Sequence, residues 1–531
     1  MDNVQLTLTP AEAARQESVK KALAKQLRVP FQSLLGYRII RQSVDARQRQ
    51  LKVLLTVQPF FSEKEKKLPA YPEPVYKDVH NAGRQVIIVG GGPAGLFAAL
   101  TLLEHGIRPV ILERGKEVSQ RKIDIALLNR NLGLNPDSNY CFGEGGAGTF
   151  SDGKLFSRSK KRGNMQRVME LFHYFGAEDT VLYEAHPHIG SDVLPRIIRA
   201  MRATILRQGG EVHFCTKVTE LLFRPSPVSR SVCGVRTADG KEWLADAVFL
   251  AIGHSAHDTY NMLYRQDVRL EPKGFALGVR VEHPQSLIDR LMYHGQPRGE
   301  FLPAASYSLV TQVQGRGVYS FCMCPGGHIV PAGSGDQHCV VNGMSASRRN
   351  SPYANSGMVV EVRPEDINAM SGFIPSDTSS ALRGLVLQQA VEHLAYIHGE
   401  PPSKAPAQCL RDFVDGRFSS DLPACSYLPG IVPSRLDEWL PPFVALRLQQ
   451  GFRDFDRHYH GFLTNSAVLL GVESRSSSAV RIPRDPLTRE HIEICGLYPC
   501  GEGAGYAGGI TSSALDGISA ALRFAAASET F

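Results

Sequence analysis

The chain has 531 residues, with 59 Lys and Arg against 52 Asp and Glu, and 43% of its residues are hydrophobic. This length exceeds what one hydrophobic core supports, so two or three domains and an enzyme-sized pocket are expected. No apolar run approaches the ~20 residues that span a bilayer, and no signal-peptide pattern opens the chain. The ten scattered cysteines include no Cys-x-x-Cys pair and exclude a disulfide scaffold. We therefore predict a cytoplasmic protein with reduced thiols, no membrane span and no metal site.

The N-terminal segment holds most of the net charge. Residues 1–80 carry 14 basic and 8 acidic side chains, which is +6 of the total of +7. Thr9 and Glu12 predict a capped helix to about Leu27, and the alternation of apolar residues predicts strands at 4–8, 37–41 and 51–57. This order predicts a basic βαββ module of the ferredoxin-like kind over residues 1–80. A proline-rich linker is expected over 61–83.

The basic face of this module has three interpretations. It is a solvated surface, a docking site for an acidic redox protein, or a site that binds RNA. Charge alone does not distinguish them.

The strongest chemical signal begins at Arg84. The apolar run 86–89 is typical of a strand buried on both faces, and the sequence Gly-Gly-Gly-Pro-Ala-Gly follows it before a helix over 96–105. Gly90 would make the tight turn, Gly92 would let the backbone approach a pyrophosphate, and Gly95 would let helix and strand pack closely. The phosphates would lie at the positive end of the helix. This predicts a dinucleotide site.

The acid expected of such a site follows at the end of the next strand. Glu113 comes directly after the apolar run 109–112, where its carboxylate can accept hydrogen bonds from both ribose hydroxyls. A carboxylate there would repel a 2′-phosphate, which argues against NADP at this site.

The other end of the chain favours FAD. A strand over 492–498 is followed by a glycine-rich loop and a small-residue helix from 512 to about 525. Gly501 and Glu502 resemble the Gly-acid pair that holds the ribityl chain in two-dinucleotide-type flavoproteins, although the acid there is commonly Asp. The helix N-terminus would point at the flavin pyrimidine and favour the anionic reduced flavin.

The loop 143–153 between these two signals can be interpreted in the same way. Its glycines allow backbone amides to approach the phosphates and the flavin ring, and Lys154 would place positive charge near flavin N1. Phe150 and Asp152 stand where a disulfide reductase begins its redox cysteine pair, so that reaction class is not favoured. The predicted cofactor-binding residues are Gly90, Gly92, Pro93, Ala94, Gly95, Glu113, Arg114, Gly146, Thr149, Lys154, Val218, Gly253, Gly501, Glu502, Gly509, Ile510 and Thr511.

Four segments, 144–154, 320–327, 341–345 and 501–510, together resemble the bacterial family described as uncharacterised FAD-dependent dehydrogenases, within the glutathione-reductase-like flavoproteins. The resemblance implies FAD as cofactor and covers almost the whole chain. Two departures from the family pattern are His257 in a usual Arg position and Ala479 in a usual Pro position.

The resulting fold class is α/β, with a Rossmann-like FAD-binding domain over 84–265 and 455–531. A substrate domain built on an antiparallel β sheet would be inserted over 266–454, in addition to the N-terminal α+β module. Short alternating runs broken by Gly and Pro over 268–343 predict this sheet, and a helix is expected over 377–398.

Catalytic candidates within this frame are few. If Cys322 and Cys324 lie in an extended strand, their sulfurs are about 7 Å apart along the chain, too far for an easy disulfide. Cysteine is also commonly buried as a plain hydrophobe, so a redox role is the weaker of the two interpretations. His254, beside Gly253, is a general acid or, more simply, a histidine that caps the backbone.

The predicted function is that of an FAD-dependent oxidoreductase that transfers hydride between the flavin and an unknown substrate. No second nucleotide fingerprint is present, so electrons would come from a transiently docked NAD(P)H, from the substrate itself or from a redox protein. The alternative is a flavin-containing RNA-binding or RNA-modifying protein that uses its basic N-terminal module.

Overall fold

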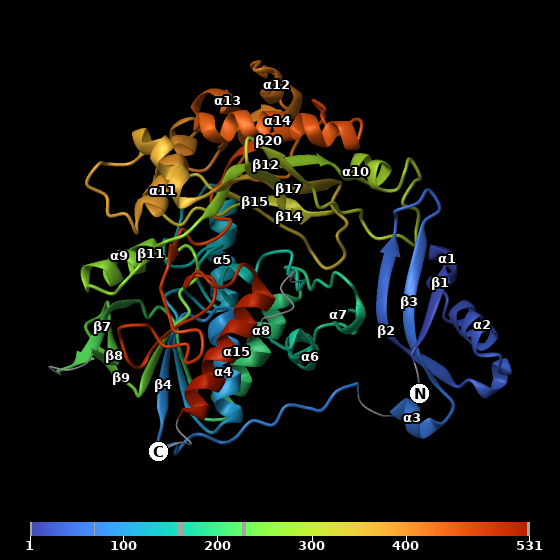
Figure 1. The fold of residues 1–531 in the computed structure, drawn as a ribbon, viewed down its shortest axis with the longest axis horizontal. Coiled ribbons are helices and arrows are strands. Elements are labelled where there is room, and N and C mark those ends of the chain that lie inside the picture. Colours follow the sequence, from blue (N-terminus) through green and yellow to red (C-terminus); the bar gives the residue numbers. More distant parts are fainter. Residues whose placement is uncertain (1–2, 68–69, 157–162, 226–229, 528–531) are drawn as a thin grey trace.

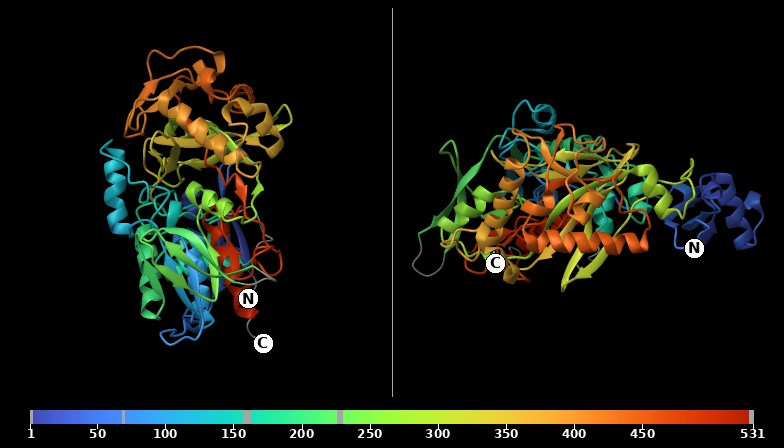
Figure 2. Two further views of the ribbon diagram at one scale, coloured as in Figure 1. Left: turned by 90° about the vertical axis from the view of Figure 1, so that its left-hand side faces the viewer. Right: turned by 90° about the horizontal axis from the view of Figure 1, so that it is seen from above.

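The structure is a computed structural model and describes residues 3–67, 70–156, 163–225 and 230–527. Three sheet-based units are arranged around the centre of the molecule (Figure 1). The N-terminal unit projects from one end, which is clearest when the molecule is seen from above (Figure 2). No helix in the described ranges has both the length and the apolar character needed to cross a bilayer.

The N-terminal unit is a three-stranded antiparallel sheet in the order β1-β3-β2, with one helical layer. The predicted capping box is present, because Glu12 N donates to Thr9 Oγ1 (3.3 Å) and Thr9 N donates to Glu12 Oε2 (2.9 Å). The helix expected to run to Leu27 is divided in two, since Arg15 has extended φ/ψ angles. The bounds are β1 Val4–Leu8, α1 Pro10–Ala13, α2 Gln16–Leu27, β2 Gly36–Asp45, β3 Lys52–Phe60 and α3 Glu63–Lys67.

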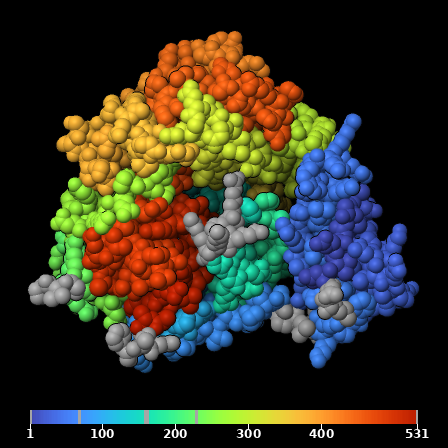
Figure 3. All heavy atoms as spheres, viewed as in Figure 1, coloured from blue at the N-terminus to red at the C-terminus, as the bar shows by residue number. Residues whose placement is uncertain are grey.

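This unit contacts the rest of the chain through one edge of its sheet and one hairpin end. Ala185 N donates to Gln42 O (2.9 Å), and the His294 ring lies 2.7 Å from Ala46 O. In the space-filling view the blue N-terminal residues form a lobe on one side of the molecule (Figure 3).

The second unit is centred on a five-stranded parallel sheet in the order β22-β10-β4-β5-β6. Successive residues of β4 point to opposite faces, which are both covered: Val86 and Ile88 pack against helices, whereas Ile87 and Val89 pack against a small antiparallel sheet. The strands are β4 Gln85–Val89, β5 Arg108–Leu112, β6 Glu211–His213, β10 Ala247–Leu250 and β22 Leu497–Pro499. The covering elements are α4 Pro93–Glu104, α6 Met165–Tyr174, α8 Leu194–Arg207 and α15 Ile510–Ala526 on one face and β7 Val218–Arg224, β8 Ser231–Thr237 and β9 Glu242–Leu244 on the other.

Strand β22 is much shorter than the strand predicted over 492–498. Gly496 has a φ of +76°, which takes the chain out of an extended conformation immediately before β22. Residues 491–496 instead form turns and isolated bridges, in which Val232 N donates to Cys495 O (3.0 Å).

The third unit is a seven-stranded sheet in the order β13-β14-β17-β12-β20-β18-β19, in which only the pair β18–β19 is parallel. Helices α11 to α14 cover its outer face (Figure 1). Two boundaries differ from those predicted: β20 lies beyond residue 454, and the helix expected from 377 begins at Arg383 because 377–382 form turns. The bounds are β12 Phe275–Pro284, β13 Val310–Val313, β14 Arg316–Cys324, β17 Tyr353–Val362, β18 Ala405–Cys409, β19 Ile431–Pro433, β20 Val468–Glu473, α11 Arg383–Ile397, α12 Leu410–Asp415, α13 Leu436–Trp439 and α14 Pro442–His458.

The remaining elements are short. They are α5 Val118–Asn129, α7 Thr180–Tyr183, α9 His257–Arg265, α10 Gln285–Met292, the pair β11 Glu271–Pro272 and β21 Val480–Arg481, and the pair β15 His328–Pro331 and β16 Val341–Met344.

Candidate cofactor and substrate site

The glycines of the turn after β4 have different surroundings. A Cβ on Gly90 would lie 2.5 Å from Ala251 O, and a Cβ on Gly95 would lie 2.1 Å from Gly90 O, so neither position accepts a side chain. For a Cβ on Gly92, the nearest protein atom is Gly146 Cα at 3.7 Å. The protein itself therefore leaves room at Gly92, as expected where another group approaches the backbone.

Glu113 lies at the end of β5 and is almost fully buried. Its Oε2 accepts a hydrogen bond from Gly91 N (2.8 Å), and its Oε1 accepts from Gly115 N (2.9 Å) and Gly143 N (3.0 Å). One carboxylate therefore joins the first glycine turn to the later loop. Its predicted contact with ribose stays a prediction.

Arg114 and Val218 flank this carboxylate. The Arg114 guanidinium pairs with Asp137 and Asp258, at 2.9 Å from Asp258 Oδ1, and it lies 4.1 Å from the centroid of the Phe142 ring. The side chain of Val218, at the start of β7, is buried in the core under the parallel sheet. Both residues shape the region next to Glu113.

The loop that contains Gly146 packs directly over the first glycine turn. Gly145 N donates to Gly91 O (2.8 Å), and Thr149 Oγ1 donates to Glu144 O (3.0 Å), so the Thr149 hydroxyl stabilises the loop itself. Arg121, which the sequence analysis missed, is completely buried and donates to the carbonyls of the loop, including Glu144 O (2.7 Å). An arginine within an otherwise ordinary helix pattern carries no sequence signal for this role.

The C-terminal fingerprint packs against the same turn. A Cβ on Gly517 would lie 2.0 Å from Ala94 O, so α15 and α4 are in backbone contact at this point, directly behind Pro93. Thr511 Oγ1 donates to Leu155 O (2.7 Å), and Ile510 packs on Gly148. The two residues before α15, Gly508 and Gly509, have no protein atom within 4 Å of an added Cβ. The N-terminus of α15 therefore borders open space, as the first glycine turn does.

Gly253 joins this arrangement through Gly503. A Cβ on Gly503 would lie 2.6 Å from Gly253 O, and Tyr260 Oη donates to Gly503 O (2.7 Å). Gly501 has a φ of +77°, and its Cβ would lie 2.8 Å from Ala94 Cβ. The segments expected from the sequence to surround one cofactor are thus brought together around Gly92.

His254 and Glu502 lie near each other in this region, with His254 Nδ1 3.8 Å from Glu502 Oε2. Burial lowers the pKa of His254 to about 4, and the nearby Arg475 cation acts in the same direction. Burial raises the pKa of Glu502 to about 7. His254 is therefore neutral at pH 7, which argues against its role as a general acid and favours a structural role.

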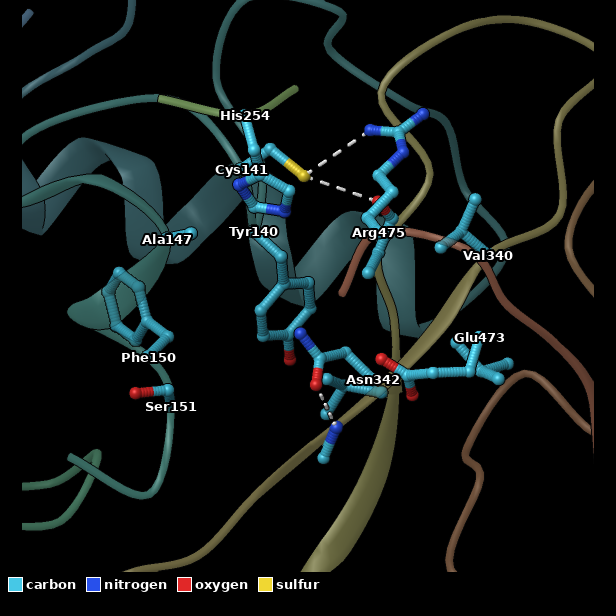
Figure 4. Close-up of a pocket in the computed structure, with 14 residues that line it drawn as sticks. Tyr140, Cys141, Ala147, Phe150, Ser151, His254, Val340, Asn342, Glu473 and Arg475 are labelled. Atoms are coloured by element: carbon cyan, nitrogen blue, oxygen red, sulfur yellow. Dashed lines mark hydrogen bonds between the residues drawn. The ribbon is translucent and has the colours of Figure 1, made fainter. Parts of the chain in front are cut away.

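A small, partly open pocket lies between these loops and the seven-stranded sheet unit (Figure 4). On the sheet side Arg475 forms a two-pronged ion pair with the buried Glu392 (2.9 and 2.8 Å) and also donates to Cys141 Sγ (3.6 Å). The residues around the pocket include Tyr140, Cys141, Ala147, Phe150, Ser151, His254, Val340, Asn342, Glu473 and Arg475.

The extended conformation considered for Cys322 and Cys324 is wrong. The register of β14 against β17 shifts between Phe321 and Cys324, and Cys322 has a φ of +47°, so this part of the strand is a bulge and is not extended. A bulge redirects the side chains that it contains. As a result both sulfurs lie near one ammonium group, since Lys154 Nζ is 3.9 Å from Cys322 Sγ and 3.5 Å from Cys324 Sγ.

These features suit a dinucleotide with a flavin. Two helix N-termini, those of α4 and α15, are available to a phosphate or an anionic ring. An added Cβ meets no protein atom within 4 Å at Gly253, Gly508 and Gly509, and at Gly92 it makes only ordinary contact at 3.7 Å. Over the described ranges, no group of three or more His, Cys, Asp or Glu side chains is arranged to hold a metal ion.

The comparisons with known proteins define the class first. Residues 84–136 match the model of an FAD binding domain, and residues 274–476 match a model described as "FAD-dependent protein, C-terminal domain-like". The protein is a flavoprotein with a Rossmann-like α/β FAD-binding fold, and FAD is its cofactor. Residues 1–60 match a domain of unknown function, which gives no support to RNA binding.

The family follows from a full-length relative. An uncharacterised protein of Clostridium beijerinckii is 39% identical over 521 residues, which cover 95% of each chain. The chain belongs to the same family of FAD-dependent proteins.

The solved structures that match this chain resemble it only distantly. One is a geranylgeranyl bacteriochlorophyll reductase-like protein of Thermoplasma acidophilum, with 12% identity, a TM-score of 0.35, and coverage of 84% of this chain and 79% of that chain. Another is the 3-ketosteroid Δ1-dehydrogenase of Sterolibacterium denitrificans, with 11% identity, a TM-score of 0.35, and coverage of 84% and 100%. TM-scores this low carry no argument about substrate.

Proposed function

We propose that the protein is an FAD-dependent oxidoreductase of the glutathione-reductase-like type that transfers hydride between the flavin and an organic substrate. The observation that supports this most is the position of the pocket. Its walls come from two units: Ala147, Phe150 and His254 lie on the cofactor side, and Asn342 and Glu473 lie on the side of the seven-stranded sheet. Hydride transfer needs a substrate space of this kind against the cofactor, closed off from bulk water.

In this proposal the discontinuous FAD-binding domain holds the cofactor, and the sheet unit over about 266–476 supplies the substrate side. The Gly92 turn and the N-terminus of α4 would bind the pyrophosphate through backbone amides. Glu113 would bind the adenosine ribose, and Gly501 and Glu502 would bind the ribityl chain. FAD, when bound, supplies the hydride chemistry.

Two positive groups would act on the ring system. The N-terminus of α15, at Ile510 and Thr511, carries the positive end of the helix dipole and favours a negative charge beside it. Lys154 is held by Asp152 (3.4 Å), and this carboxylate offsets the effect of burial and raises the pKa of Lys154. The ammonium is therefore retained at neutral pH and above.

The cofactor site is tested by a substitution that the protein alone can accommodate. Because an added Cβ at Gly92 lies 3.7 Å from the nearest protein atom, Gly92→Val should fold but should fill the space for the phosphates. Gly83→Val is the matched control, since an added Cβ there meets no protein atom within 4 Å and Gly83 lies outside the site. We expect wild-type protein and Gly83→Val to take up FAD, and Gly92→Val to lose it. FAD uptake by a folded Gly92→Val protein would refute this pyrophosphate site.

The oxidoreductase activity is tested by anaerobic reduction of the bound flavin with NADH, NADPH and, separately, cell extract. Rapid bleaching by one nicotinamide would identify a transiently docked electron donor, and bleaching by extract alone would indicate a substrate or a redox protein. No bleaching under any of these conditions would reject the proposed activity.

A further inference from the structure

The bulge of β14 gives Cys322 and Cys324 unequal environments around a shared cation. Cys324 is completely buried, whereas Cys322 is partly exposed. The Lys154 ammonium lies within hydrogen-bonding reach of both sulfurs, and Arg280 Nη2 lies 3.7 Å from Cys324 Sγ. The same Arg280 nitrogen donates to Cys322 O (2.8 Å), which holds the bulge in place.

The two sulfurs share the nearby cations but differ in exposure and in hydrogen bonding, and this difference favours the partly exposed Cys322 as the thiolate. A hydrogen bond with Cys324, followed by the charges of Lys154 and Arg280, holds the pKa of Cys322 well below its usual range. The pKa of Cys324 lies well above its usual range because of that hydrogen bond and its burial. A nucleophilic and a resolving cysteine of a thiol redox pair differ in this way.

Both cations are paired with buried carboxylates. Arg280 Nη1 donates to the buried Glu473 carboxylate (2.7 Å), and Lys154 shares Asp152 with Arg349, which donates from Nη2 (2.6 Å). The charged and titratable groups that face Cys322 are therefore Cys324, Lys154, Arg280, Asp152, Glu473 and Glu502.

The pair borders the proposed substrate pocket. Arg280 Nη1 also lies 3.3 Å from Asn342 Oδ1, and both Asn342 and Glu473 line the pocket. The Cys322 charge acts on the Glu502 carboxyl, whose pKa is raised by burial and then further by this sulfur. The thiols thus lie beside the Lys154 ammonium and are linked to the pocket through Arg280 and Asn342.

We propose that Cys322 and Cys324 are a redox-active dithiol that reduces disulfides, with Cys322 as the attacking sulfur and Cys324 as the resolving sulfur. The Cys322 thiolate forms a bond to one sulfur of the incoming disulfide, and the other sulfur leaves as a thiolate. Cys324 then loses its proton and attacks Cys322 Sγ, and the second thiol of the substrate leaves with the bonding electron pair. The protein dithiol is oxidised by two electrons and the external disulfide is reduced to one thiol and one thiolate, because the single proton from Cys324 passes to one of the two departing thiolates.

This inference rests on the proposed function in one respect: it names disulfides as the substrate class of that oxidoreductase, so that reduced flavin would return electrons to the new disulfide. The sequence argument against a Cys322–Cys324 disulfide assumed an extended strand, and the bulge removes that assumption. The redox cysteines are supplied by the other unit.

The test uses the folded full-length protein, with and without FAD, and oxidised glutathione as the probe. After a timed reaction and alkylation, mass spectrometry follows the tryptic peptide 317–348, whose fragment ions separate Cys322 and Cys324 from Cys339. We expect an intramolecular Cys322–Cys324 disulfide in the wild type. We expect Cys324→Ser to accumulate a glutathione adduct on Cys322, and Cys322→Ser to leave Cys324 unmodified.

Lys154→Met and Lys154→Arg measure the role of the cation without turnover. The rate of alkylation of Cys322 at pH 7 should fall about tenfold for each unit by which its pKa rises in Lys154→Met, and Lys154→Arg should restore part of it. The exposed Cys215 is the internal control, and its rate should stay constant.

The outcomes separate this inference from the proposed function. The dithiol is refuted if Cys215 reacts with glutathione while Cys322 does not, or if the two serine variants form equal adducts. Flavin uptake and reduction without the disulfide would reject the dithiol and leave the oxidoreductase standing. Formation of the Cys322–Cys324 disulfide in a protein that takes up no FAD would reject the FAD-dependent oxidoreductase and leave the dithiol standing.

Discussion

Replacing Glu113 by Gln changes a single oxygen at the point where three backbone segments meet. The carboxylate accepts hydrogen bonds from Gly91 N, Gly115 N and Gly143 N through its two oxygens. Glutamine keeps one acceptor oxygen, which best serves the pair at Gly115 and Gly143. Its NH₂ group then faces the N–H of Gly91, and two donors oppose each other in a buried site. One charge-assisted hydrogen bond is lost and one buried donor is left unsatisfied, which should together destabilise this unit by about 2–4 kcal/mol.

The two tryptophans of the chain allow this loss to be assigned to one unit. Trp243 lies in β9 beside the parallel sheet, and Trp439 lies in the seven-stranded unit. In a Trp439→Phe background, guanidinium unfolding of the FAD-free protein followed by Trp243 fluorescence should show a lower midpoint for Glu113→Gln. The matched control is Asp246→Asn, because Asp246 is an exposed carboxylate that accepts one bond, from Gln85 N (2.8 Å). Its loss should cost less than about 1 kcal/mol. Equal midpoints for Glu113→Gln and Asp246→Asn would show that the three bonds do not act as described.

Three other changes have defined outcomes. Gly517→Ala places a Cβ 2.0 Å from Ala94 O and should destabilise the protein by about 3 kcal/mol, whereas Gly83→Ala should change its free energy of unfolding by less than about 0.5 kcal/mol; equal thermal unfolding of the two would contradict the close contact of α4 and α15. Thr9→Ala removes the capping box and should lower the opening free energy of α1 by about 1 kcal/mol, measured by hydrogen exchange, and unchanged exchange would count against it. Burial raises the pKa of Glu282 from 4.5 to about 7, so its contribution to stability is greatest below about 4.5 and is lost as the pH rises through 7. Glu282→Gln should therefore remove up to about 3 kcal/mol of pH dependence between pH 5 and 8, and parallel stability profiles of variant and wild type would refute this assignment.

The cofactor turns could be predicted because their constraints are local. Gly90 is required by its own positive φ of +106° and Gly95 by Gly90 O, five residues before it, and such constraints leave a fixed spacing in the sequence. The N-terminal capping box is local in the same sense, with Thr9 and Glu12 three residues apart. Both were identified from residue type and spacing alone.

The thiol site could not be predicted, since its determinants are distant in the chain. The positive φ of Cys322 arises where β14 loses its register against β17, and the bulge is held by Arg280 from β12. Arg280 is itself paired with Glu473, 193 residues later. The sequence offered the Cys-x-Cys pair and an arginine between Val279 and Val281, but neither indicates that the two would lie together. The strand expected over 492–498 is shorter for a local reason, because the left-handed Gly496 delays its start to Leu497.

The buried ion pairs are concentrated where the FAD-binding and sheet units meet, and this placement argues for a role in positioning. Burying an ion pair costs more solvation free energy than a well-packed apolar contact of the same volume, so such pairs are poor sources of stability. Arg280 with Glu473 and Arg475 with Glu392 nevertheless lie beside the pocket, with exposures between 0% and 8%. Separating the two partners would leave an uncompensated buried charge. Each intact pair therefore holds its two side chains in one geometry. Arg280, held in this way by Glu473, donates to Cys322 O and keeps the bulge in place. The buried charges therefore lie where they fix the orientation of a reactive sulfur.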